Sequence, residues 1–311
     1  MSDFDIKGIS LMIHDRKLTL ALIFGLAVVS TSAKAAEKMP YVQHEDVVYR
    51  QEYGVALVMD IFVPTGEKNG IGIVDVVSGA WHSDRSKIKQ HKMAQMYDIF
   101  TKKGFTVFAV RPGSITKFSA TEMLQNIKQG VRWVKEHAEE YGVDPDNLGM
   151  TGASAGGHLA CLASVTAHDG EKSDGTDVKA TAIFFPPTDF TMYGTTAVDP
   201  KGDDRFGQIV RALAFRDGVD GLSDEEITAK IEAISPAKLV HKQVPAFLFI
   251  HGDADPAVPL QQSEVMVEAL KNAGAEAKLI VKPGGGHPWL TIHEEVAILA
   301  DWLETQLVKK Q

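Results

Sequence analysis

The chain has 311 residues, of which 44% are hydrophobic and 23% are charged, and its formal net charge at pH 7 is -9. This is the composition of an ordinary globular protein with enough material for one large core. The acidic balance argues against nucleic acid as a partner, because lysine and arginine clusters are what neutralise a phosphate backbone.

The amino terminus carries the pattern of a secretory signal peptide. Residues 18–29 form an uncharged apolar run that follows two basic residues, and an Ala-Lys-Ala site ends at residue 35. This run is shorter than the roughly 20 residues that span a bilayer, which favours cleavage over a retained anchor. We therefore expect residues 1–35 to be removed, leaving residues 36–311 as a single domain, periplasmic or secreted, without stable membrane insertion.

Strand and helix patterns alternate along the rest of the chain. Two extended runs, residues 46–49 and 56–63, predict an antiparallel hairpin at a sheet edge. Further strands are expected at residues 71–77, 105–110, 178–185, 244–250 and 277–281, besides one that runs into residue 152. Helices are expected at residues 86–103, 120–141, 155–167 and 260–273, and from about residue 289 onwards. This alternation predicts an α/β protein with a mostly parallel sheet covered by helices on both faces.

About fifty residues of different character, residues 188–240, separate the strands at 178–185 and 244–250. They include an apolar-periodic stretch at residues 204–215 and a second helix opened by the capping-box sequence of Ser223. The same signature, at Ser119, opens the helix over residues 120–141. The segment is rich in charge, so we expect a small helical cap over the site with no broad lipid-docking face.

A strand-turn-helix joint at residues 152–156 organises the chemistry. The sequence Gly-Ala-Ser-Ala-Gly follows the turn sequence of residues 144–147 and leads into an Ala- and Leu-rich helix. This is the pattern of a nucleophile elbow, in which glycines on either side of the strained serine avoid steric clashes. The alternative is a plain turn with a capping serine. We expect Ser154 to project above the carboxyl edge of the sheet.

Two further loops begin where predicted strands end. Residues 251–259 contain Asp253 and Asp255, and residues 284–289 contain His287. A serine hydroxyl needs an imidazole to take its proton and a carboxylate to orient that imidazole. The order serine, acid, histidine is that of α/β-hydrolases.

These motifs resemble the α/β-hydrolase superfamily over residues 45–308. The sequence Gly-Ala-Ser-Ala-Gly-Gly-His at residues 152–158, together with residues 251–259, is most similar to the hormone-sensitive-lipase-like esterases, in the bacterial deacetylating and feruloyl esterase branch. The resemblance implies Ser154 as nucleophile, His287 as general base and Asp255 as acid. Asp253 is the competing acid, and Asp255 is favoured because the family places its acid at the second aspartate of this motif.

The oxyanion loop departs from the family. Where relatives carry His-Gly-Gly-Gly-Trp, this chain has Val77-Ser-Gly-Ala-Trp81. Backbone donors need no particular side chain, so Gly79 and Ala80 can still serve beside Ala155, the residue after the nucleophile. Which residue of 79–81 donates is left open by the sequence.

Several other side chains are weaker candidates. Trp81 and Trp289 are expected to line an acyl or aromatic pocket, unless they belong to the core. His158 lies one helical turn after Ser154, and we expect it to be a hydrogen-bonded support. No Cys/His spacing suits a metal, and the only cysteine, Cys161, cannot form a disulfide within the chain. We expect neither metal nor cofactor.

The resulting hypothesis is a serine hydrolase that cleaves carboxylic esters, with short acyl groups on small-molecule or oligosaccharide alcohols, including acetyl and feruloyl esters of polysaccharide fragments. Two alternatives remain. A prolyl-oligopeptidase-like peptidase shares the order of the triad but normally places a large β-propeller before the catalytic domain. A catalytically silent binding protein on the same fold would carry no functional triad.

Overall fold

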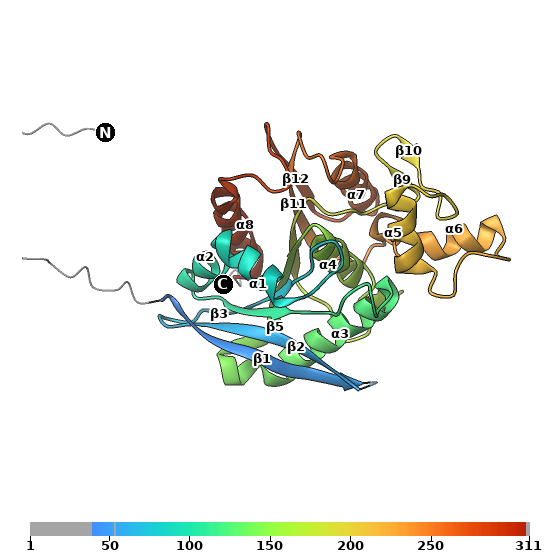
Figure 1. Ribbon diagram of the computed structural model, residues 1–311. Coiled ribbons are helices and arrows are strands. Elements are labelled where there is room, and N and C mark those ends of the chain that lie inside the picture. Colours follow the sequence, from blue (N-terminus) through green and yellow to red (C-terminus); the bar gives the residue numbers. More distant parts are fainter. Residues whose placement is uncertain (1–38, 53, 309–311) are drawn as a thin grey trace, which may run out of the picture. The chain divides into compact units, whose positions relative to one another are not determined.

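One eight-stranded sheet runs through the computed structural model, which describes residues 39–52 and 54–308 (Figure 1). Its strand order is β1-β2-β4-β3-β5-β8-β11-β12, and only the pairs β1–β2 and β2–β4 are antiparallel. The strands are β1 (Tyr41–Glu52), β2 (Val55–Pro64), β3 (Gly70–Val76), β4 (Thr106–Val110), β5 (Val143–Ala153), β8 (Ala180–Phe184), β11 (Ala246–Gly252) and β12 (Ala277–Lys282). The mostly parallel sheet and its amino-terminal edge hairpin are confirmed. The expected signal peptide, residues 1–35, lies outside the described residues.

Helices cover both faces of this sheet (Figure 1). One face carries α1 (Arg85–Met93), α2 (Met96–Lys102) and α8 (Ile292–Leu307); the other carries α3 (Ala120–His137), α4 (Ala155–Val165) and α7 (Gln261–Asn272). Along β3, Ile71 and Ile73 pack into the core beneath α1, α2 and α8, whereas Val74 and Val76 pack into the core beneath α3, α4 and α7. Burial on both faces is why the central strands are continuously apolar rather than alternating.

The single helix expected at residues 86–103 is wrong, because the structure divides it into α1 and α2. Gln95 has a left-handed backbone, with φ 56°, between the two helices. This break allows a side chain from each helix to reach Asp75, a buried residue of β3. His91 Nδ1 lies 2.7 Å from the Asp75 carboxylate, and the Tyr97 hydroxyl donates to the same oxygen at 3.0 Å.

Other boundaries differ from expectation by a few residues. The turn sequence at residues 144–147 is a bulge within β5, since Val143 pairs with Gly70 while Leu148 pairs with Gly72. The helix expected to run to residue 141 ends as α3 at His137 and continues as a 3-10 turn, Ala138–Tyr141. The capping boxes of Ser119 and Ser223 are both present.

The segment at residues 188–240 contains two short helices, α5 (Arg205–Ala214) and α6 (Asp224–Glu232), with the two-residue strands β9 (Met192–Tyr193) and β10 (Thr196–Ala197). Gln262 of α7 anchors it. The Gln262 side-chain oxygen accepts the backbone N–H groups of Thr188 and Asp189, at 2.7 and 2.8 Å, and its amide donates to the Met192 carbonyl at 2.8 Å. The remaining short elements are the hairpin strands β6 (His168–Asp169) and β7 (Lys172–Ser173), and the 3-10 turn Pro236–Lys238.

The joint between β5 and α4 is packed too tightly for any side chain at two of its glycines. A Cβ atom on Gly156 would lie 2.2 Å from the Val76 carbonyl oxygen, and one on Gly152 would lie 2.6 Å from the carbonyl oxygen of Gly156. The glycines therefore relieve contacts with β3 and with each other. The sequence placed the clash that these glycines avoid at the serine, whereas the structure places it at Val76 and at the other glycine.

We predict that Gly156→Ala destabilises the protein by at least about 1–3 kcal/mol, because the added methyl group would meet rigid backbone. Urea unfolding of the purified protein measures this change. Gly286→Ala is the matched control, because a Cβ atom there would meet nothing closer than 3.6 Å. Equal midpoints for the two variants would contradict the packing argument.

Candidate functional site

Three side chains from three loops meet at the carboxyl edge of the sheet. Ser154 follows β5, Asp255 follows β11 and His287 follows β12. His287 Nε2 lies 2.8 Å from Ser154 Oγ, and His287 Nδ1 lies 2.7 Å from Asp255 Oδ2. A carboxylate only accepts hydrogen bonds, so Nδ1 carries the ring proton and Nε2 is free to accept from the serine. The structure thus brings together all three residues that the sequence singled out.

Ser154 itself has a strained backbone, with φ 54° and ψ -123°. Such a conformation is rare for a residue with a side chain and persists only where the surroundings hold it. Its N–H donates to the Phe184 carbonyl at 3.0 Å, and its carbonyl accepts the N–H of His158 at 2.9 Å. These two bonds fix the turn between the sheet and α4.

The Asp255 carboxylate is buried and fully hydrogen-bonded. Its Oδ1 accepts the backbone N–H groups of Ala257 and Val258 at 2.8 and 2.9 Å, and its Oδ2 lies 3.5 Å from Nε2 of buried His251. Burial alone would raise the pKa of Asp255, but hydrogen bonds from His251, His287 and Val258 outweigh it and hold the pKa well below its ordinary value. The group is therefore an anion beside the imidazole.

Asp253, the competing acid, has a different task. Its Oδ1 accepts the backbone N–H of Gly284 at 2.6 Å, and the residue is exposed. It therefore ties the loop after β11 to the loop that carries His287. The geometry places Asp255, the aspartate that the family resemblance favoured, beside the imidazole.

Aromatic side chains support the histidine loop. The Phe185 ring lies 4.4 Å from the His287 ring, between centroids, and Trp289 packs edge-on against Phe185 at 5.9 Å. The Trp289 indole donates to Glu295 of α8 at 2.7 Å. Trp289, expected to line a substrate pocket, thus anchors this loop. The packing of Phe185 against the imidazole could not be predicted from the sequence, because the contact joins residues about 100 positions apart in the chain.

Residues 79–82 form a tight turn beside α4, the helix that follows Ser154. Gly79 and His82 exchange both backbone hydrogen bonds at 2.9 Å, and Ala80 and Trp81 have φ of 47° and 57°, as in a type I′ turn. The expectation that Gly79 donates to an oxyanion is therefore wrong, because its N–H is already used. The candidates that the sequence leaves for this role are Ala80 and Ala155.

Trp81 is buried beneath this turn rather than exposed in a pocket. Its indole N–H donates to His158 Nδ1 at 2.9 Å, and His158 Nε2 lies 2.8 Å from the carbonyl oxygen of Ile234. His158 is thus a hydrogen-bonded support, as expected. Its bond to Trp81 was not foreseen, since the two residues are 77 positions apart.

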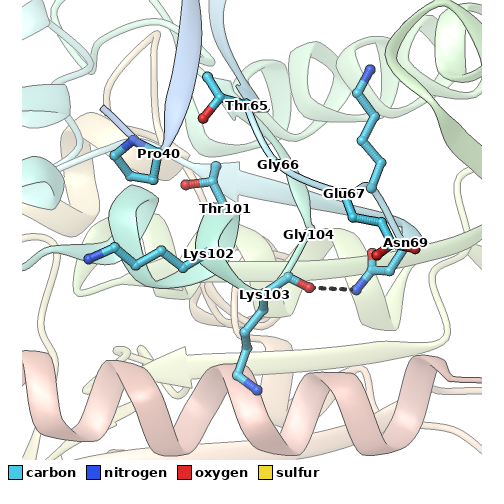
Figure 2. Close-up of a pocket in the computed structure, with 10 residues that line it drawn as sticks. Pro40, Thr65, Gly66, Glu67, Asn69, Thr101, Lys102, Lys103 and Gly104 are labelled. Atoms are coloured by element: carbon cyan, nitrogen blue, oxygen red, sulfur yellow. Dashed lines mark hydrogen bonds between the residues drawn. The ribbon is translucent and has the colours of Figure 1, made fainter. Parts of the chain in front are cut away.

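Within residues 39–52 and 54–308, no group of three or more metal-ligating side chains could hold an ion. In that same part of the chain, no helix is long and apolar enough to cross a membrane. A cavity of about 480 Å³ lies at the opposite edge of the sheet, where β3 begins, and is lined by Pro40 and residues 65–69 and 101–104 (Figure 2). The cavity shares no residue with the Ser154 site.

Comparison with known proteins agrees with this arrangement. The BD-FAE family model matches residues 59–270. Esterase LipQ of Mycobacterium tuberculosis is 27% identical over 65% of the chain and 46% of LipQ, and acetylxylan esterase of Xylanibacter ruminicola is 24% identical over 79% of the chain and 48% of that protein. The chain therefore spans about half the length of the curated relatives it matches.

Solved structures extend the comparison to whole folds. A truncated carbohydrate esterase from gut microbiota superposes with a TM-score of 0.72 at 25% identity, covering 88% of this chain and 99% of the other. The Thermogutta terrifontis esterase 2 structure, at 23% identity and a TM-score of 0.63 over 86% of this chain and 94% of that one, shares the fold. The chain belongs to the BD-FAE family of α/β-hydrolase esterases.

Proposed function

We propose that this protein is a serine hydrolase that cleaves carboxylic esters through an acyl-enzyme. The observation that carries the proposal is the unbroken hydrogen-bonded chain from Ser154 Oγ through His287 to the buried Asp255 carboxylate. This is the arrangement in which an imidazole activates a serine, and a carboxylate fixes the tautomer and stabilises the imidazolium that forms. Esterases among the relatives and solved neighbours support the same reaction class.

The reaction follows from the positions of the three groups. Ser154 Oγ attacks the ester carbonyl carbon while its proton passes to His287 Nε2. The tetrahedral intermediate then expels the alcohol, whose oxygen takes that proton from Nε2, and an acyl-Ser154 remains. Water next gives a proton to Nε2, attacks the acyl carbon, and releases the carboxylic acid as the proton returns to Ser154 Oγ.

Negative charge on the carbonyl oxygen requires donors that are already in place. Ala155 begins α4, where the first backbone N–H groups have no partner within the helix and the helix dipole favours an anion. Ala80 supplies a second N–H from the turn at residues 79–82. These two backbone groups form the proposed oxyanion hole, and neither depends on the side chain.

The substrate class we propose is a short acyl group on a hydrophilic alcohol, including acetyl and feruloyl esters of polysaccharide fragments. The segment at residues 188–240 carries charged, exposed side chains, and Met192 is its only exposed large hydrophobic residue among those described. A lipid-docking face would need a contiguous apolar patch. The relatives named acetylxylan esterase and carbohydrate esterase point the same way.

We further propose that the protein is exported, to the periplasm or beyond the cell. The support is the apolar run at residues 18–29 followed by the Ala-Lys-Ala site, which is the pattern of a cleaved signal peptide. Export would place the enzyme where polysaccharide fragments are met. Amino-terminal sequencing of the protein recovered from its native host tests this proposal, with a start at Ala36 as the expected result.

We predict that Ser154→Ala lowers kcat for a nitrophenyl acetate ester by roughly 10⁴-fold to 10⁶-fold, because the three residues act as a unit. Labelling by a fluorophosphonate probe should disappear in the same variant, while the thermal unfolding midpoint stays close to that of the wild type. Retained turnover in this variant would overturn the mechanism. Absence of labelling and turnover in the wild type would instead indicate a silent binding protein.

Asp255→Asn should cost about 10⁴-fold in kcat, because an amide at this position favours the wrong tautomer of His287. Asp253→Asn is the matched control, since it makes the same chemical change in the same loop. The Asp253 carboxylate bonds to the Gly284 backbone and not to the imidazole. We expect it to cost less than about tenfold, or ~1.4 kcal/mol. The comparison is made from steady-state kinetics at one pH, and equal losses would refute the assignment of the acid.

For a series of nitrophenyl esters, we expect kcat/KM to be highest from acetyl to butyryl and to fall by at least about tenfold by a ten-carbon chain, a difference of ~1.4 kcal/mol. Acetylated xylan and methyl ferulate, assayed beside them, distinguish between the two polysaccharide esters. Activity that rises through ten and twelve carbons, with activation at an oil-water interface, would replace this substrate class with a lipase.

A further inference from the structure

A buried polar path that the triad does not use connects the turn at residues 79–82 to the segment at residues 188–240. The Trp81 indole N–H meets His158 Nδ1 at 2.9 Å, and His158 Nε2 meets the Ile234 carbonyl at 2.8 Å. The exposed fractions of Trp81, His158 and Ile234 are 5%, 0% and 1%. A polar group this deeply buried costs free energy of folding unless it has a hydrogen-bond partner. Loss of either hydrogen bond of His158 would therefore be unfavourable.

The partners fix the tautomer of His158. A backbone carbonyl only accepts and an indole N–H only donates, so Nε2 must carry the proton and Nδ1 must offer its lone pair. Burial, partly offset by the Ile234 carbonyl, lowers the pKa of His158 to about 4. The ring is therefore neutral near pH 7, and its acceptor atom stays available to Trp81.

Trp81 needs this support because its backbone is unfavourable. Ala80 and Trp81 both have positive φ, which residues other than glycine rarely adopt. Such a backbone persists only where the surrounding structure holds it. The Trp81 carbonyl is held by the N–H of Ile115 at 2.8 Å, and its indole is held by His158. Hydrogen bonds to the backbone carbonyl and to the side chain of Trp81 therefore hold the turn.

We propose that His158 is a positioning residue that sets the oxyanion turn against the nucleophile helix, by accepting the hydrogen bond of Trp81. His158 lies on α4 with Ala155, and its N–H bonds to the Ser154 carbonyl, so the two proposed donors are held by one rigid unit. Ile234 contributes by holding the tautomer that accepts. This inference rests on the proposed ester hydrolysis and assigns a role to a residue outside the triad.

Two amide replacements separate the two bonds of the imidazole. In His158→Asn, the side-chain oxygen takes the place of Nδ1 and can accept from Trp81, but nothing reaches Ile234. In His158→Gln, the longer amide can donate to the Ile234 carbonyl, and nothing replaces Nδ1. Trp81→Phe removes the donor while it keeps an aromatic ring at the site.

We expect Trp81→Phe and His158→Gln to lower kcat by roughly 10-fold to 100-fold with KM changed by less than about threefold, because a small displacement of a donor costs turnover rather than binding. His158→Asn should keep at least about a third of the wild-type kcat. The double variant with Trp81→Phe and His158→Gln should lose no more than either single change, as two partners of one interaction do.

A second measurement isolates the oxyanion. A trifluoromethyl ketone forms a tetrahedral adduct with the serine, so its inhibition constant should rise in parallel with the loss of kcat/KM across the variants. The inhibition constant of the carboxylic acid product should not follow that trend. Thermal unfolding midpoints are recorded for every variant, and Trp81→Phe carries the test if a His158 variant fails to fold.

Equal losses in the Asn and Gln variants, losses confined to KM, or losses of kcat that follow the unfolding midpoint would overturn the positioning role. The wild type and Ser154→Ala run in the same assay. If the wild type turns over no ester, the proposed function fails and the positioning role fails with it. If the wild type is active and all His158 variants match it, only the positioning role is refuted.

Discussion

The contact between the Gly156 backbone and the end of β3 is the constraint on which the site depends. A Cβ atom at Gly156 would lie 2.2 Å from the Val76 carbonyl oxygen. The start of α4 can therefore approach the end of β3 this closely only because residue 156 is glycine. The Gly156 N–H also donates to the Ser78 carbonyl at 3.0 Å. One backbone crossing thus places Ser154 directly beside the turn that follows β3, so the proposed oxyanion donors, Ala80 and Ala155, lie on two segments that are bonded to each other.

The histidine loop is fixed by a second close approach of backbone to backbone. A Cβ atom on Gly252 would lie 2.1 Å from the Gly285 carbonyl, and the Ala254 N–H donates to that same carbonyl at 3.0 Å. Asp253 adds its bond to Gly284. Backbone contacts and the Asp253 side chain therefore join the loops after β11 and β12, and this holds the segments that carry Asp255 and His287 close together.

The segment at residues 188–240 contacts both sides of this arrangement. Phe190 packs against His158 at 4.7 Å and stacks on Phe206, and Tyr193 stacks on Phe206 at 3.7 Å. The Tyr193 hydroxyl donates to the Ala257 carbonyl in the acid loop at 2.7 Å. This segment therefore contacts both His158, the hydrogen-bond partner of Trp81, and the loop that carries Asp255.

Local pattern in the sequence determined the alternating strands and helices, the capping boxes and the loops that carry Ser154, Asp255 and His287, since strand ends in a parallel sheet gather at one edge. The family resemblance favoured Asp255 over Asp253, but only the tertiary structure shows that the Asp255 carboxylate meets the imidazole while that of Asp253 bonds to Gly284. The tertiary structure also excluded Gly79 as an oxyanion donor, because its N–H already donates to the His82 carbonyl. The sequence could not predict this turn, since Ala80 and Trp81 adopt left-handed backbones that residues other than glycine disfavour. Trp81 and Trp289 became anchors for the same reason: their indole N–H groups needed buried acceptors, and only packing of distant segments could bring His158 and Glu295 to them.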